Sequence, residues 1–316
     1  MSLPRATATG IVACALLLGC GSGTAPSGGV AVTPPSGPDP GTGSGACAIP
    51  AEAAAEDVSR PTTVVGSGRP ETCTPEAFEA AVQRGGVITF SCGPDPVTIT
   101  LPREIRLLNN VGPGGLGDRV IDGGGKVTLS GGGRNRILYQ DGCDESLHWI
   151  TDHCQDFPHP RLVLQNLRFQ GGVTTDATRG GGAVFARSGQ LKIVNSVFVS
   201  NRCADVGPDV AGGAVYALQQ AGPVHVVNST FGGGAGLGNA GSNGGALGSI
   251  GVSWVVLNSV LSHNQAVGVG MNETAPYGGN GGAVYNDGNT FSLTICGSDV
   301  SSSEASSAPA FTRSPG

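Results

Sequence analysis

The chain has 316 residues, with 55 Gly, 21 Pro and a formal net charge of −6. The Gly content without a strict three-residue period excludes collagen, and a hydrophobic fraction of 39% is too high for a wholly disordered chain. The acidic charge balance gives no basic face, which argues against nucleic acid as a partner.

The N-terminal segment predicts export. Arg5 precedes an apolar run, residues 11–18, that is too short to span a bilayer. The run ends in Leu-Leu-Gly-Cys at 17–20, which resembles a bacterial lipobox. This resemblance implies a signal peptide over residues 1–19, a lipid on the thiol of Cys20 and anchoring in the outer membrane. An ordinary secretory signal with a chance Cys is the alternative.

Residues 20–46 are rich in Gly, Pro and Ser and predict a flexible tether. Such a segment cannot pack a core, but it holds an anchored domain away from a membrane surface. The folded domain is therefore expected to begin near residue 47.

Seven Cys follow Cys20: Cys47, Cys73, Cys92, Cys143, Cys154, Cys203 and Cys296. An exported chain meets an oxidising compartment, so disulfides are expected. Cys73 with Cys92, and Cys143 with Cys154, would each close a short loop, although spacing alone leaves the connectivity open. Because seven is odd, one thiol stays free or pairs between chains. No CxxC pair supports a zinc site, and no metal site is predicted.

One short helix is predicted before the repeats. Thr74 suits the N-cap and Pro75 the first helical position, and Gly85 ends the helix. Phe78, Ala81 and Val82 give it one apolar face. We expect this helix to cap the N-terminal end of the domain.

An internal repeat dominates the rest of the sequence. The motif Gly-Gly-Ala-Val/Leu begins at residues 181, 212, 244 and 281, and Asn follows an apolar run at 166, 195, 228 and 258. A period near 30 residues, with runs rich in β-branched residues, indicates stacked units of short strands. The predicted fold is all-β, a right-handed parallel β-helix over residues 47–300. A polar tail is expected at 301–316.

Two features of the repeat carry specific expectations. The Gly pair permits a tight corner or a close backbone approach between coils, and the following Ala and Val face inward. The recurring Asn predicts a ladder of side-chain hydrogen bonds, with a second ladder at Asn201 and Asn264.

The GGA[ILV] copies and Phe198-Val199-Ser200-Asn201 resemble the repeats of the chlamydial polymorphic outer membrane protein family. Three further stretches are similar to surface proteins of the pectin-lyase-like β-helix superfamily: residues 73–93, "VIDGGGKVTLSGGG" and "LVLQNLRFQGG". The resemblance covers residues 73–300 and implies a fold more than an activity. The FxxN motif is imperfect here. Gly234 stands at the Asn position after Phe231, and in one copy Leu261 stands at the Phe position before Asn264.

The superfamily also contains polysaccharide lyases and hydrolases. The loops before the GGA corners hold Asp176, Arg179, Asp205 and Asp209, and Glu273 precedes the fourth corner. Stacked acids there would suit a carboxylate pair or a Ca²⁺ site, and Ca²⁺ enters only under the lyase hypothesis. Solvated loop charge is the alternative interpretation. No other cofactor is predicted.

The insertion at 143–159 is a further candidate. "HWITDHC" faintly resembles a pectate lyase stretch, but an inserted Thr151 shifts its register. Trp149, Phe157 and Tyr139 would stack on a sugar or pack the loop onto the domain, and we favour packing.

We therefore predict a non-catalytic cell-surface lipoprotein with an adhesion or glycan-binding surface. Its partners would be the membrane, through the lipid, and a polysaccharide or cell-surface ligand. The alternatives are a lyase or glycoside hydrolase acting on uronate-type polysaccharide, and a purely structural envelope component.

Overall fold

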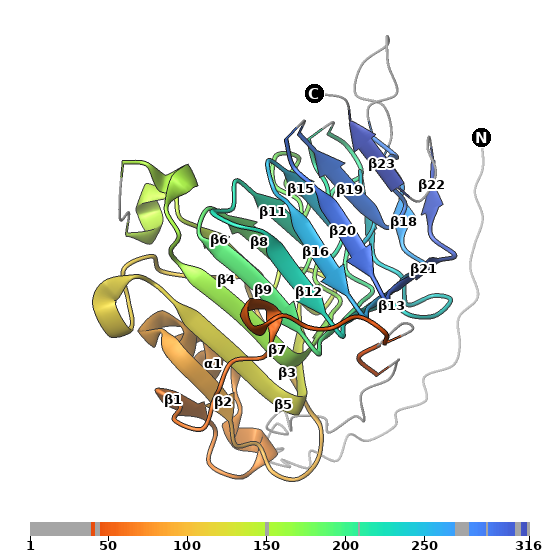
Figure 1. Cartoon of the computed structure of the whole chain (residues 1–316). Helices are drawn as coiled ribbons and strands as arrows, with labels where there is room; N and C mark the ends of the chain where they lie inside the picture. Colours follow the sequence, from red (N-terminus) through yellow and green to blue (C-terminus); the bar gives the residue numbers. More distant parts are fainter. Residues whose placement is uncertain are drawn as a thin grey trace, which may run out of the picture.

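The computed structural model describes residues 39–41, 45–148, 152–207, 209–268, 278–288 and 290–306, and the backbone of 311–314. The predicted signal peptide, Cys20, most of the tether, Trp149 and Glu273 lie outside these residues. The described part is all-β, with parallel sheets curled around one core and a single α-helix (Figure 1). Within it, no helix combines the length and the apolar character needed to cross a membrane.

Strands dominate the secondary structure. The first part holds β1 (Thr63–Val65), β2 (Gly86–Phe90), β3 (Val97–Thr100), β4 (Ile105–Arg106), β5 (Arg119–Ser130), β6 (Leu138–Asp141) and β7 (Arg161–Gln170). The regular repeats hold β8 (Val184–Arg187), β9 (Gln190–Val194), β10 (Val197–Val199), β11 (Val215–Leu218), β12 (Val224–Val227), β13 (Thr230–Gly232), β14 (Ala240–Gly241), β15 (Leu247–Ile250), β16 (Trp254–Leu257), β17 (Val260–Ser262) and β18 (Gln265–Ala266). The last strands are β19 (Val284–Asp287), β20 (Leu293–Cys296), β21 (Asp299–Ser301), β22 (Glu304–Ala305) and β23 (Phe311–Ser314).

Each strand pairs with the equivalent strand of the next repeat, always in parallel. One sheet contains the order β20-β16-β12-β9-β7-β10-β13-β17-β21, a second has β23-β19-β15-β11-β8-β6-β4, and a third has β14-β18-β22. The repeat period of the sequence therefore becomes a solenoid-like stack in which the chain visits the sheets in turn.

The GGA corners form as the sequence predicts. The first Gly of each copy has a φ between 54° and 71°, and all four Ala are fully buried. A Cβ on Gly182 would lie 2.5 Å from the carbonyl oxygen of Arg202 and 2.6 Å from that of Gly213. Real Cβ atoms do not approach backbone this closely, so the second Gly is required by the contact between repeats.

The interior Asn ladder is present, and the corner ladder joins three of its four predicted members, because the Asn258 amide donates instead to the backbone carbonyl of Cys47. Asn195 Nδ2 donates to Asn166 Oδ1 at 3.1 Å, and Asn228 Nδ2 donates to Asn195 Oδ1 at 3.2 Å. All three residues sit at corners with φ between 46° and 53°, a conformation that Asn tolerates better than most residues. The second ladder runs through the interior from Asn201 to Asn239 to Asn264, each step 2.9 Å long. Asn239 had not been predicted as its middle member.

The core beneath these corners is built from stacked identical positions. The rings of Phe169, Phe198 and Phe231 lie face to face, with 4.6 Å between successive centroids. This spacing follows from the parallel pairing of β7, β10 and β13, which holds equivalent side chains one strand apart.

The predicted helix is confirmed as α1 (Pro75–Arg84). The Thr74 side chain accepts a hydrogen bond from the backbone N–H of Ala77, and Phe78, Ala81 and Val82 are buried in the main core. It lies at the end of the stack beside β1 and β2 (Figure 1). The buried Arg119 donates from Nε to the carbonyl of Val82 at 2.7 Å, which satisfies the C-terminal turn.

Short 3₁₀ helices connect the irregular segments. They are η1 (Ala51–Ala53), η2 (Pro70–Thr72), η3 (Pro113–Gly115), η4 (Glu145–Leu147) and η5 (Cys154–Asp156). The segment expected as a polar tail differs from the prediction, because β22 and β23 continue the stack by pairing with β18 and β19. Backbone hydrogen bonds between neighbouring repeats do not require apolar side chains, so a Ser-rich sequence is compatible with these strands.

Three disulfides join described residues: Cys73–Cys92, Cys143–Cys154 and Cys47–Cys296. The first two are the pairs suggested by the sequence spacing. The third spans 249 residues and had no sequence signal. Cys203 is the remaining thiol in this part of the chain; it is buried, and burial raises its pKa to about 11.

Candidate functional site

The N-terminal segment 45–56, called the strap here, crosses the outer face of the large sheet (Figure 1). At one end Cys47 is bonded to Cys296, and its backbone exchanges two hydrogen bonds with the Asn258 side chain, at 3.0 and 2.8 Å. In the middle, the buried Ala53 packs against Val194, Val227 and Leu257. The strap is therefore part of the folded domain.

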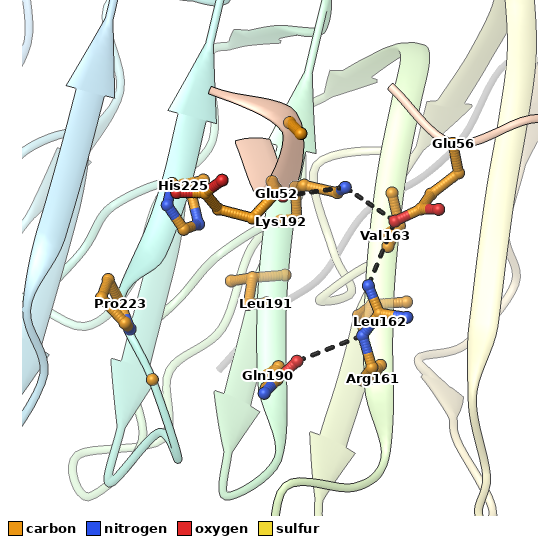
Figure 2. A pocket seen from close by; sticks show the side chains of 12 residues that line it. Glu52, Glu56, Arg161, Leu162, Val163, Gln190, Leu191, Lys192, Pro223 and His225 are labelled. Carbon is orange, nitrogen blue, oxygen red and sulfur yellow. Dashed lines mark hydrogen bonds and ion pairs between the residues drawn. The ribbon is translucent and has the colours of Figure 1, made fainter. Parts of the chain in front are cut away.

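A cavity of about 310 Å³ lies between the strap and strands β7, β9 and β12. We call it the strap pocket. The strap contributes Glu52 and Glu56. The sheet contributes Arg161, Gln190, Lys192 and His225, with Pro223 at the turn before β12, and these side chains surround one space (Figure 2).

One ion network organises the pocket. Lys192 Nζ lies 2.7 Å from Glu56 Oε1 and also donates to the backbone carbonyls of Ala54 and Glu52, at 2.7 and 3.2 Å. Arg161 pairs with the same carboxylate oxygen at 3.1 Å and donates from Nε to Gln190 at 3.1 Å (Figure 2). The ammonium is nearly buried, whereas 41% of the Arg161 side chain is exposed.

The network sets the protonation states. Burial favours the neutral acid at Glu56, but the hydrogen bonds and charges of Lys192 and Arg161 outweigh burial and lower the pKa of this carboxyl. Burial lowers the pKa of His225; the nearby Glu52 carboxylate opposes this shift and Lys192 adds to it. At neutral pH Glu56 is therefore ionised and His225 is uncharged, so the imidazole offers a ligand one donor and one acceptor nitrogen.

The loop acids predicted from sequence take separate partners. Asp176 pairs with Arg179 at 3.6 Å, and Asp205 pairs with Arg202 at 3.4 Å. Asp209 is exposed, and its backbone carbonyl accepts a hydrogen bond from Tyr216. In the part of the chain that is described, no group of three His, Cys, Asp or Glu side chains is placed to hold a metal ion.

Two of the aromatic candidates, Tyr139 and Phe157, lie in the described part of the chain and differ in their surroundings. Tyr139 is buried and stacks on Phe185 with 5.2 Å between ring centroids, and its hydroxyl lies 3.0 Å from Asp141 Oδ2. Phe157 lies against the ring of His159, 5.5 Å away. The burial of Tyr139 agrees with the packing interpretation for that residue, whereas Phe157 is half-buried and its ring contact is with a residue of its own loop.

The strap pocket was not predicted from the sequence, although the repeat carries part of the signal for it. Lys192 and His225 both lie three residues before a ladder Asn, and they are register partners on β9 and β12. Three further lining residues each lie five residues before a ladder Asn: Arg161, Gln190 and Pro223. Alignment on the Asn would have grouped these outward positions, but nothing in the repeat marks the strap that covers them.

Comparison of the chain with protein-family models, with curated proteins and with solved structures gives no match. The functional argument therefore rests on the geometry of the site.

Proposed function

We propose that the chain is an exported, lipid-anchored surface protein with a right-handed parallel β-helix that binds glycans. The proposal retains Cys20 as the lipid attachment site and the outer membrane as the location. Support comes from the parallel pairing of equivalent strands, the two Asn ladders and the three disulfides, which suit an oxidising compartment. A relationship to the pectin-lyase-like and polymorphic outer membrane protein families is part of the proposal.

The strap pocket is the proposed binding site for one sugar residue. The observation that carries this is its mixture of donors and acceptors: Arg161, Gln190 and His225 from the sheet, and the carboxylates of Glu52 and Glu56 from the strap. Sugar hydroxyls donate and accept at once, and such a lining matches them. The volume lies at the small end of ligand pockets, which run from roughly 300 to 1,000 Å³.

The protonation states favour binding over catalysis. A glycoside hydrolase needs one carboxylic acid that carries a proton, whereas Lys192 and Arg161 hold Glu56 ionised. A lyase needs a basic side chain that accepts a proton, whereas the Lys192 ammonium donates to three oxygens. These two groups therefore act in the proposal as binding and positioning groups.

Calorimetric titration tests the proposal. The mature chain, made with Cys20→Ser so that it carries no lipid, is titrated with short uronate and neutral oligosaccharides. Arg161→Met and His225→Val are each expected to weaken binding by about tenfold, the equivalent of one hydrogen bond to a charged or fixed group. Arg69→Met serves as control because that side chain is 72% exposed and outside the pocket.

The outcomes separate the hypotheses. Absence of binding across the panel, or equal binding by the pocket variants and the wild type, would overturn the glycan proposal. Formation of unsaturated products or new reducing ends, with and without Ca²⁺, would instead support the lyase or hydrolase alternative.

A further inference from the structure

A second cavity, of about 450 Å³, lies beside the strap pocket. Its lining includes Gln155, Asp156, Gln219, Gln220, Ile250 and Phe291. We call it the corner cavity, because Gln219 and Gln220 belong to the turn between β11 and β12. An aromatic ring, a branched aliphatic side chain, three amides and one carboxylate therefore face one space.

This lining matches a sugar ring. Phe291 is half-buried, and its Cε2 lies 3.7 Å from the position that a Cβ on Gly251 would occupy, so the ring spreads over backbone without a side chain. Gln220 is held in place, since its Nε2 donates to the carbonyls of Ser188 and Leu218 at 3.0 and 3.2 Å. The exposed Gln155 and Asp156 add polar groups to the lining. An apolar face with polar groups at its edge is the complement of a pyranose.

The two cavities share their walls. Residues 219–221 line the corner cavity, and the next two residues, Gly222 and Pro223, line the strap pocket. A second segment also reaches both cavities, because Gln155 and Asp156 line the corner cavity and Arg161 lines the strap pocket. Ala221 and Gly222 are consecutive, so their Cα atoms are about 3.8 Å apart. A Cβ built on Gly222 would meet no atom within 4 Å, so the backbone between the cavities is uncrowded.

From this shared wall we propose that the corner cavity is a second sugar subsite and that the ligand is a linear polysaccharide. Its chain passes over Ala221 and Gly222 and places one sugar in each cavity. This inference rests on the proposed glycan function of the strap pocket. It specifies which class of glycan binds, a linear polysaccharide, since a single terminal sugar would use only one cavity.

The test uses oligosaccharides of increasing length on the mature chain with Cys20→Ser. Once an oligosaccharide is long enough to fill both cavities, its affinity is expected to rise by about tenfold or more, because the second contact is intramolecular. Phe291→Ala and Asp156→Ala are expected to remove this gain and to leave the affinity for the shortest ligand unchanged. Arg161→Met is expected to weaken binding at every length. Near-ultraviolet circular dichroism checks that each variant is folded, and the exposed Asp156 gives a second variant if Phe291→Ala is not.

Three results would overturn the inference. If affinity does not depend on length, or if both corner variants match the wild type at every length, the corner cavity is not a subsite, whereas the glycan function stands on its short ligands. If no oligosaccharide of any length binds to the wild type, the proposed function itself fails, and the subsite fails with it.

Discussion

The Lys192 ammonium and the Glu56 carboxylate are 2.7 Å apart, although 136 residues separate them in the chain. Lys192 belongs to β9 and Glu56 to the strap, so this pair joins the N-terminal segment to the face of the sheet. The Lys192 side chain is 8% exposed and the Glu56 side chain 31% exposed, and the pair is therefore less screened by solvent than a surface salt bridge.

Lys192→Met keeps most of the side-chain volume and removes the charge. The carbonyl of Ala54 then loses the Lys192 donor and Glu56 keeps only Arg161, and the free energy of unfolding is expected to fall by about 2 kcal/mol. Urea denaturation measures the change. Lys126→Met is the matched control, because Lys126 is exposed, and a change within about 0.5 kcal/mol is expected there. Equal effects of the two substitutions would contradict a structural role for the pair.

The Glu56 carboxyl predicts acid sensitivity. Its pKa in the folded chain lies below the ordinary value of 4.5, so the unfolded chain takes up the proton first as the pH falls. The contribution of the ionised Glu56 to the free energy of unfolding is complete above the pKa of Glu56 in the unfolded chain. It is lost as the pH drops through the lower pKa of Glu56 in the folded chain. Glu56→Gln should therefore be less stable than the wild type at neutral pH, and the difference should shrink in acid. Urea midpoints measured along a pH series test this; a difference that stays constant with pH would refute it.

The disulfides predict unequal losses. Cys47–Cys296 closes 249 residues and Cys143–Cys154 closes 11, so the chain-entropy model gives about 5 and about 3 kcal/mol, respectively. We expect Cys47→Ser with Cys296→Ser to lower the thermal midpoint more than Cys143→Ser with Cys154→Ser. The reverse order in calorimetry would show that the strap contributes little to global stability.

The Asn ladder predicts a difference between two substitutions at one site. Asn195 has a φ of 48° and takes part in two ladder hydrogen bonds. Asn195→Gly removes those bonds but suits the backbone, whereas Asn195→Ala also adds left-handed strain of about 1 kcal/mol. The Ala variant should therefore be the less stable of the two in urea. Equal stabilities would mean that the ladder, and not the backbone conformation, accounts for the Asn.

The GGA corner predicts a strict requirement for Gly. Gly182→Ala would push a methyl group against the backbone of Arg202 and Gly213 and should abolish or severely reduce folding. Gly222→Ala meets no atom within 4 Å and should be tolerated. Expression level and thermal midpoint compare the two variants, and tolerance of Gly182→Ala would contradict the close approach.

The features of the fold that recur in every repeat could be predicted from the sequence. Gly182, Asn195 and Asn228 recur at fixed offsets because each repeat contacts its neighbours in the same way, so the strands, corners and ladders followed from the period. The helix followed from local signals at Thr74 and Gly85, and two disulfides followed from short spacings.

The strap and its pocket could not be predicted in the same way. Cys47 and Glu56 contact residues more than 100 positions away, and their segment shares no pattern with the strands that it crosses. The Ser-rich C-terminal strands were missed for another reason. Their pairing depends on backbone groups and on hydroxyls such as Ser303 Oγ, which accepts from the backbone N–H of Asn264 at 3.2 Å, and these carry no hydrophobic signal.

The Cys47–Cys296 bond also determines how the domain would bear mechanical load. A pull on the N-terminal end of the chain reaches Cys47 before it reaches β1 or α1, and the bond passes the force directly to β20. The 249-residue loop between the two cysteines is thereby bypassed. The first strands and the helix are consequently shielded from tension, and extension of the folded repeats under force requires that this single covalent link be broken.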